Sequence, residues 1–190
     1  MNVDGVAARI GGYLRKQEAH RILLPASEAT RNVLKATILR CKEHLYVCGG
    51  FNGQHALSSV ERLSPDQDHW QVMPSMSERH DEASSVVIDG RLYVCGCFDG
   101  HQAGSAVERY DPDLNRWESL PPMSQARGNA MAVTLQGQLY ICGGYDGHRA
   151  LNTAERLDPE QRRWYPMPPM SEARNAAVGA TISGQILICG

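Results

Sequence analysis

Short apolar runs recur along this chain at a fixed interval, and each is apolar at every position. The clearest are Leu45–Cys48, Leu92–Cys95 and Leu139–Cys142, whose first residues are 47 positions apart. A β-strand without a polar face must be covered on both sides, as happens where sheets stack against one another. The pattern therefore predicts a row of stacked sheets with one such strand in each.

Three further strands are predicted around each central run. A strand of small apolar residues precedes it, at Val33–Leu39, Ala83–Ile88, Ala130–Leu135 and Ala176–Ile182. In the last three copies a two-residue turn ending in glycine joins the two strands, and glycine supplies the positive φ that a tight hairpin needs. A third strand follows at Val60–Leu63, Val107–Tyr110 and Ala154–Leu157, and it ends at a Ser-Pro or Asp-Pro turn. The fourth strand carries Trp70, Trp117 or Trp164.

Radial repetition of a four-stranded antiparallel unit predicts an all-β fold of the propeller type. The predicted repeats are residues 36–82, 83–129 and 130–176, with a partial repeat at 177–190. Residues 1–35 do not follow the pattern, and we expect them to form an irregular or weakly helical leader.

Charged residues recur in phase with the strands. Glu61, Glu108 and Glu155 keep the 47-residue step, and so do Arg127 and Arg174 further along the unit. Positions that repeat in every unit belong to the scaffold. We therefore expect structural ion pairs within or between sheets rather than acid–base chemistry, and we expect the tryptophans to pack between sheets.

These motifs resemble those of the kelch-repeat family. The shared features are the double glycine after the apolar strand (Gly49-Gly50 and Gly143-Gly144), the Glu-Arg pair, the turn before proline, the tryptophan and a Pro-x-Met-Ser-x-x-Arg tail. The resemblance covers residues 36–190 and implies an incomplete kelch-type β-propeller, with three full four-stranded blades and the first strands of a fourth. A WD-repeat propeller is the structural alternative, but it has a shorter period and a Trp-Asp ending.

The sequence departs from the family pattern in three ways. Cys97 replaces the second glycine of the middle copy, which predicts a less free backbone there. His80 stands where the later copies have the tail arginine, with Arg79 one position early. Kelch propellers commonly have six blades, so the resemblance implies a fragment, a truncated product, or a chain that associates to cover its end faces.

The composition argues against some classes of function. A formal net charge of -2 gives no basic patch for nucleic acid, and no apolar run approaches the roughly 20 residues of a membrane span. Cys48, Cys95, Cys142 and Cys189 share one repeat position, and equivalent positions on stacked sheets lie about 10 Å apart, too far for a disulfide. They predict buried thiols in a reducing compartment, which favours the cytoplasm. Neither the cysteines nor the histidines show metal-site spacing, so we expect no metal or other cofactor.

Long connections of such sheets lie at one end and short turns at the other, and loops usually carry recognition. The candidate contacts between the second and third strands are Phe51, Asn52, His55, Phe98, Asp99, His101, Tyr145, Asp146, His148 and Arg149. Those in the tails are His80, Asp81, Glu82, Arg127, Asn129, Arg174 and Asn175. Aromatic, Arg, His and Asn side chains suit protein or peptide recognition. Asp99 and Asp146 each precede glycine, which is also typical of turn chemistry.

The resemblance implies a non-catalytic protein-interaction module. The favoured function is substrate recognition in a cullin-RING ubiquitin ligase adaptor, with the ligase docked through a BTB region that this sequence does not contain. An actin-binding cytoskeletal kelch protein is the alternative. A kelch-scaffold enzyme, such as a copper oxidase or a sugar epimerase, is the least favoured, because no Tyr-His set stands apart from the periodic pattern.

Overall fold

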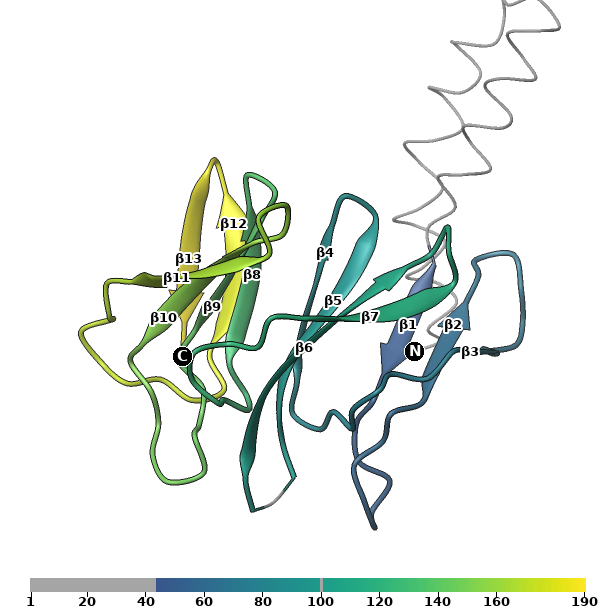
Figure 1. The fold of residues 1–190 in the computed structure, drawn as a ribbon, viewed down its shortest axis with the longest axis horizontal. Coiled ribbons are helices and arrows are strands. Elements are labelled where there is room, and N and C mark those ends of the chain that lie inside the picture. Colours follow the sequence, from purple (N-terminus) through teal and green to yellow (C-terminus); the bar gives the residue numbers. More distant parts are fainter. Residues whose placement is uncertain (1–43, 100) are drawn as a thin grey trace, which may run out of the picture. The chain divides into compact units, whose positions relative to one another are not determined.

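The computed structural model describes residues 44–99 and 101–190, and within them every regular element is a β-strand (Figure 1). The predicted leader and the predicted strand Val33–Leu39 lie outside these residues. No membrane-spanning helix occurs among the residues that the structure describes.

The strands form four antiparallel sheets in which neighbours in sequence are neighbours in space. The first sheet holds β1 (Leu45–Cys48), β2 (Val60–Leu63) and β3 (Gln71–Met73). The second holds β4 (Ser84–Ile88), β5 (Arg91–Phe98), β6 (Ala103–Asp111) and β7 (Arg116–Leu120), and the third holds β8 (Met131–Leu135), β9 (Gln138–Cys142), β10 (Ala154–Asp158) and β11 (Arg163–Met167). The fourth has β12 (Val178–Ile182) and β13 (Gln185–Cys189). The predicted four-stranded unit is confirmed in the second and third sheets.

The hairpins between the first two strands of the last three units have the predicted geometry; the turn of the first unit lies outside the described residues. Asp89 and Gly90 have φ of 49° and 74°, and the Gln136-Gly137 and Ser183-Gly184 turns match them closely. Positive φ at both central residues defines a type I′ turn, whose twist matches that of the flanking strands. These turns are therefore short and fixed.

The central strands of the second and third sheets, β5 and β9, are covered on both faces, as their apolar sequences predict. The same prediction is wrong for β1 and β13, where Leu45, Val47 and Leu187 are 57%, 49% and 47% exposed. On β5, Tyr93 and Cys95 pack against the third sheet, whereas Val94 lies in the cluster shared with the first sheet. From the third sheet, Leu139 and Ile141 are 0% exposed at the same boundary. Each large apolar side chain buried in this way contributes about 1.5–3 kcal/mol. Stacking of the sheets is thus the main source of stability.

Two tryptophans join neighbouring sheets in the same way. Trp117 donates its indole N–H to the carbonyl of Pro74 at 2.9 Å, and Trp164 donates to the carbonyl of Pro121 at 2.9 Å. In both cases the acceptor belongs to the tail of the preceding repeat. Trp70 directly precedes β3 and is 42% exposed, so the prediction that it packs between sheets is wrong for this residue.

The second sheet differs from the others near Cys97. The Gly-Gly pairs of the other copies end their strands, but here Cys97 pairs with Gly104 and Phe98 with Ala103 after a register shift. The hairpin of β5 and β6 is therefore longer than the sequence predicts. A residue with a side chain replaces the second glycine and continues the ladder, which brings Phe98 into the sheet.

Candidate protein-interaction face

The long connections gather at one end of the sheets. Figure 1 shows the β1–β2, β5–β6 and β9–β10 loops at the lower end, opposite the short hairpin turns. In each repeat the tail pairs with its own loop through recurring backbone bonds, with His80 N–H to Leu57 O at 2.9 Å as the first example. Arg127 and Arg174 repeat this bond at 3.0 Å and 2.9 Å. This end of the molecule, called here the loop end, is built from the predicted contact segments.

The same type of turn occurs inside each of the three loops. Asn52 Oδ1 accepts backbone hydrogen bonds from Gln54 at 2.9 Å and His55 at 3.0 Å. Asp99 and Asp146 accept the equivalent pair of bonds, which lower the pKa of both carboxyl groups. The turn role expected for the two aspartates is confirmed, and both remain ionised at neutral pH.

His80 connects the first and second sheets. Its Nδ1 lies 2.8 Å from Gly96 O, and its Nε2 lies 3.1 Å from Glu108 Oε1. Both partners are hydrogen-bond acceptors, so the imidazole ring joins the carbonyl of one glycine to the carboxylate of the buried glutamate. His80 is 1% exposed. The sequence placed this side chain among the partner contacts, but its burial makes it a support for the loops.

Arg127 makes the same connection between the second and third sheets. Its guanidinium donates to Gly143 O at 2.6 Å and to Glu155 Oε1 at 3.0 Å. It is 1% exposed, so it too supports the loop end from within, contrary to the expected partner contact. The expected ion pairing of the tail arginine with the strand glutamate is confirmed here.

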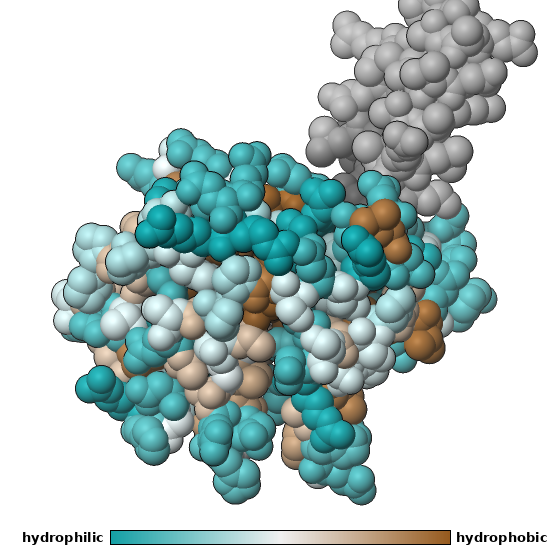
Figure 2. Space-filling view, in the orientation of Figure 1, coloured by the Kyte–Doolittle hydropathy of each residue, from teal (hydrophilic) through white to brown (hydrophobic). Residues whose placement is uncertain are grey.

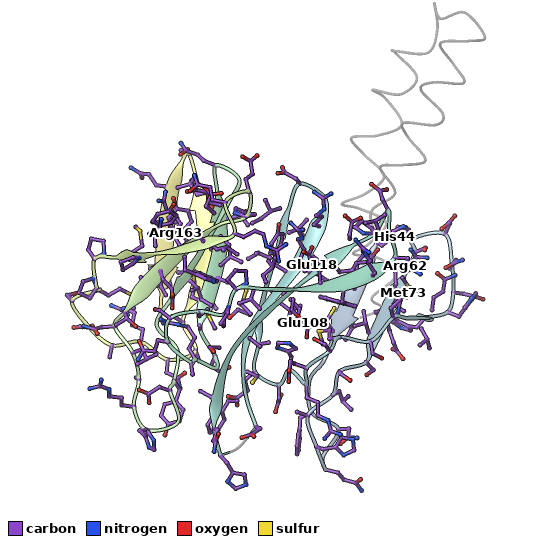
Figure 3. The ribbon with its side chains drawn as sticks, viewed as in Figure 1. His44, Arg62, Met73, Glu108, Glu118 and Arg163 are labelled. Atoms are coloured by element: carbon purple, nitrogen blue, oxygen red, sulfur yellow. The ribbon has the colours of Figure 1, made fainter. Side chains whose placement is uncertain are left out.

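Each buried glutamate also holds the preceding tail. Glu108 accepts bonds from the Ser77 amide at 2.8 Å, the Ser77 hydroxyl at 2.7 Å and the Glu78 amide at 2.9 Å. Burial raises the pKa of Glu108, but the bonds from His80, Ser77 and Glu78 outweigh it and lower the pKa to about 2. Figure 3 shows Glu108 in the space between β6 and the first sheet. These hydrogen bonds all hold parts of the fold together, so Glu108 has a structural role.

The tails contact one another through their last residues. Glu82, Asn129 and Ala176 are equivalent, and all have a left-handed backbone, with φ of 52°, 49° and 55°. The Asn129 amide donates to Glu82 O at 2.8 Å, and the Ala176 amide donates to Asn129 O at 3.0 Å. A chain of backbone bonds therefore links the tails. Glu82 is exposed and Asn129 is half-buried.

In the last tail, Arg174 is half-buried and Asn175 is exposed. The Arg174 guanidinium donates to Gly190 O and lies 3.3 Å from Glu172. This contact with the glycine carbonyl of the next sheet matches that of Arg127.

The loop aromatics have different surroundings. The rings of Phe98 and Tyr145 meet edge to face, with centroids 5.5 Å apart and an interplanar angle of 80°. Phe51 is 56% exposed. Phe98 and Tyr145 therefore pack against each other between neighbouring loops, while Phe51 presents its ring to solvent.

A cleft of about 660 Å³ opens at the loop end between the first two sheets. It is lined by Phe51 and residues 54–56, by residues 77–79 and Asp81, and by residues 97–99 and His101. This set is called the loop cleft. Figure 2 shows hydrophilic loop tips at this end, with apolar side chains exposed between them. Its volume lies in the range of ligand pockets.

The loop cleft brings together only part of the predicted set. Phe51, His55, Asp81, Phe98, Asp99 and His101 line it. His148 and Arg149 lie exposed on the third loop, where Arg149 is 3.7 Å from Asp146. In the described part of the chain, no three His, Cys, Asp or Glu side chains form a group suited to a metal ion.

A comparison with known protein families agrees with the fold and with the repeated hydrogen bonds between neighbouring sheets. The family model described as the KLHDC2/KLHL20/DRC7 Kelch-repeats domain matches residues 15–190. The chain belongs to the kelch-repeat family. A comparison with curated proteins found no match. The four sheets are thus blades of an incomplete kelch β-propeller, and kelch-repeat domains serve as protein-interaction modules.

Several residues that line the cleft in this kelch chain, among them Glu78, Arg79 and Cys97, were not predicted as contacts. Glu78 and Arg79 are exposed tail residues, and Cys97 is half-buried at the base. Arg79 and Cys97 depart from the repeat, because the next copy has Ala126 and Gly144 at these positions, whereas Glu78 recurs as Glu172 in the third copy. Departure from the period was the signal that could have identified Arg79 and Cys97.

Proposed function

We propose that this kelch chain recruits partner proteins through its loop end, as the substrate-recognition part of a cullin-RING ubiquitin ligase adaptor in the cytoplasm. The loop cleft is the observation that carries the proposal. It combines an exposed aromatic ring, Phe51, with charged side chains on loops that are fixed from below. Rigid presentation of such groups reduces the entropy lost on binding.

The use of the recurring charged residues supports recognition rather than catalysis. Glu108 receives four hydrogen bonds from the first tail, and Glu155 is held by Ser124 and Arg127. A carboxylate that is saturated by structural donors is poorly placed to exchange a proton with a substrate. The exposed loop side chains remain for contact with a partner.

Site-specific photo-cross-linking in cells tests the proposal. A benzophenone amino acid replaces His101, which is exposed at the cleft, or Asp89, which is exposed in a hairpin turn at the opposite end. We expect a discrete cross-linked protein from position 101 only. We also expect cullin to be recovered with the chain and the cross-linked protein to lose ubiquitin when the chain is depleted.

Two outcomes contradict the proposal in different ways. The same products from both positions would contradict recognition by the loop end. A cross-link to actin from position 101, without cullin, would assign the chain to the cytoskeletal class instead.

A further inference from the structure

The loop cleft carries an excess of negative charge. Glu78, Asp81 and Asp99 contribute three carboxylates, and Arg79 contributes one guanidinium. With neutral histidines, two net negative charges remain. Among the described residues, none of these four side chains takes part in an ion pair. Their charge is therefore available to a partner.

The three carboxylates act on a common point inside the cleft. Burial raises the pKa of the Cys97 thiol, and the carboxylates of Asp99, Glu78 and Asp81 raise it further. A thiolate is disfavoured where the local potential is negative. The carboxylates thus produce a shared field at the base of the cleft, where a cation would be attracted.

Phe51 and Phe98 place two aromatic rings at the border of the loop cleft. Phe98 is fixed by strand pairing with Ala103, by a 2.8 Å bond from its amide to Asp81 O, and by the ring of Tyr145. Phe51 is exposed on the opposite loop. A partner that covers Phe51 gains apolar burial, and a cation over either ring gains a further cation–π attraction.

The next boundary between blades lacks these features. Gln125, Ala126 and Gly128 occupy the positions of Glu78, Arg79 and Asp81. There the tail and the next loop join directly, because Gly128 and Tyr145 exchange two backbone bonds of 2.9 Å. The scaffold at this boundary keeps Asp146 at the position of Asp99 but is built without the carboxylates of Glu78 and Asp81, so the presence of these two residues at the first boundary is not explained by folding.

Building on the proposed function, we propose that the loop cleft binds a cationic segment of the partner protein. One apolar side chain of that segment lies between Phe51 and Phe98, and an adjacent lysine or arginine faces the carboxylates of the cleft. The carboxylates select the charge, and the exposed ring of Phe51 supplies burial.

The chain itself shows which substitutions remove charge without disturbing the loops. Asn52 holds the same turn as Asp99, so Asp99→Asn keeps both turn bonds. Gln125 is the natural counterpart of Glu78, so Glu78→Gln is compatible with the tail. Asp89→Asn makes the same kind of change in an exposed hairpin turn opposite the loop end and serves as the matched control.

Selection of short random peptides displayed on phage against the whole chain tests the proposal, followed by fluorescence anisotropy of the enriched peptides. We expect enrichment of sequences that place an aromatic or aliphatic residue beside lysine or arginine. We expect the Glu78→Gln, Asp99→Asn double variant to weaken their binding by about five- to tenfold and to reduce its salt dependence. Phe51→Ala is expected to weaken binding by about tenfold, and Asp89→Asn is expected to leave it unchanged.

The proposal is overturned if the enriched peptides are acidic or neutral, if no peptide is enriched, or if the double variant binds the enriched peptides as the wild type does. These outcomes are separate from a failure of the proposed function. A cellular partner that cross-links from position 101 and is still bound by the double variant would leave recognition by the loop end standing and remove only its charge preference.

Discussion

His80 and Arg127 are 47 residues apart and make the same connection at successive boundaries of the propeller. Each donates to the carbonyl of the first glycine of the following blade and to the buried glutamate of its third strand. An imidazole and a guanidinium therefore perform one structural task. Substitutions at this position test that equivalence directly.

We expect His80→Arg to be tolerated and His80→Ala to be costly. Arginine can supply both bonds, as Arg127 does, so the free energy of unfolding should change by less than about 1 kcal/mol. Alanine leaves Glu108 buried without its imidazole partner and should cost about 3 kcal/mol. Urea unfolding followed by tryptophan fluorescence measures both. Equal destabilisation by the two variants would contradict the equivalence.

Arg127 and Glu155 should show strong energetic coupling. Both side chains are almost fully buried and 3.0 Å apart, so removing one leaves the other with an unpaired charge. In a double-mutant cycle of Arg127→Leu and Glu155→Gln, the double variant should be more stable than the sum of the single losses predicts, by at least about 1 kcal/mol. The exposed pair of Arg149 and Asp146 provides a control cycle, in which coupling should fall below about 0.5 kcal/mol. Simple additivity at Arg127 and Glu155 would refute the buried joint.

Acid should weaken the boundary that Glu108 holds. The pKa of Glu108 falls from the ordinary 4.5 to about 2 in the folded chain, so ionised Glu108 stabilises the fold above about pH 4.5. That contribution is lost as the pH falls from 4.5 towards 2. We expect the stability difference between wild type and Glu108→Gln, measured by urea unfolding, to be a few kcal/mol at pH 7 and to shrink steadily below pH 4.5. A stability difference between wild type and Glu108→Gln that does not change with pH would show that the charge of Glu108 does not stabilise the fold.

Two glycines that look alike in sequence should respond differently to alanine. A Cβ at Gly96 would lie 2.2 Å from the carbonyl oxygen of Arg127, whereas a Cβ at Gly50 meets nothing within 4 Å. Both have positive φ, so both substitutions bring backbone strain of about 1 kcal/mol. Gly96→Ala adds a clash with backbone and should lower the melting temperature by clearly more than Gly50→Ala does. Similar melting temperatures for the two variants would argue against this close approach.

The repeating strands were predictable because burial dictates their sequence. A strand such as β5, covered on both faces, has few alternatives to continuous apolar residues, and the turn at Asp89-Gly90 needs positive φ at both positions. Because these requirements are local and recur from blade to blade, they appear in the sequence as a pattern with a 47-residue step. The same step placed Arg127 and Glu155 in phase, which is why their ion pair was foreseen.

The loop end was less predictable because its contacts join residues that do not repeat. His80 was expected at the surface, since tails at the loop end are exposed on average, yet its side chain turns inward to Glu108. The loop cleft requires loops from two blades to meet beside Cys97, whose pairing with Gly104 lengthens one hairpin. Such an arrangement depends on three-dimensional placement that no periodic pattern records.

The bonds between each tail and the next blade have a consequence for engineering. A cut at a repeat boundary would separate His80 from Glu108, so the sequence repeat is not a unit that can be transplanted by itself. Hairpin turns such as Asp89-Gly90 are exposed and lie opposite the loop end. These turns are therefore the places to create new termini by circular permutation or to insert a fluorescent reporter. A change at a turn leaves the hydrogen bonds between neighbouring blades intact.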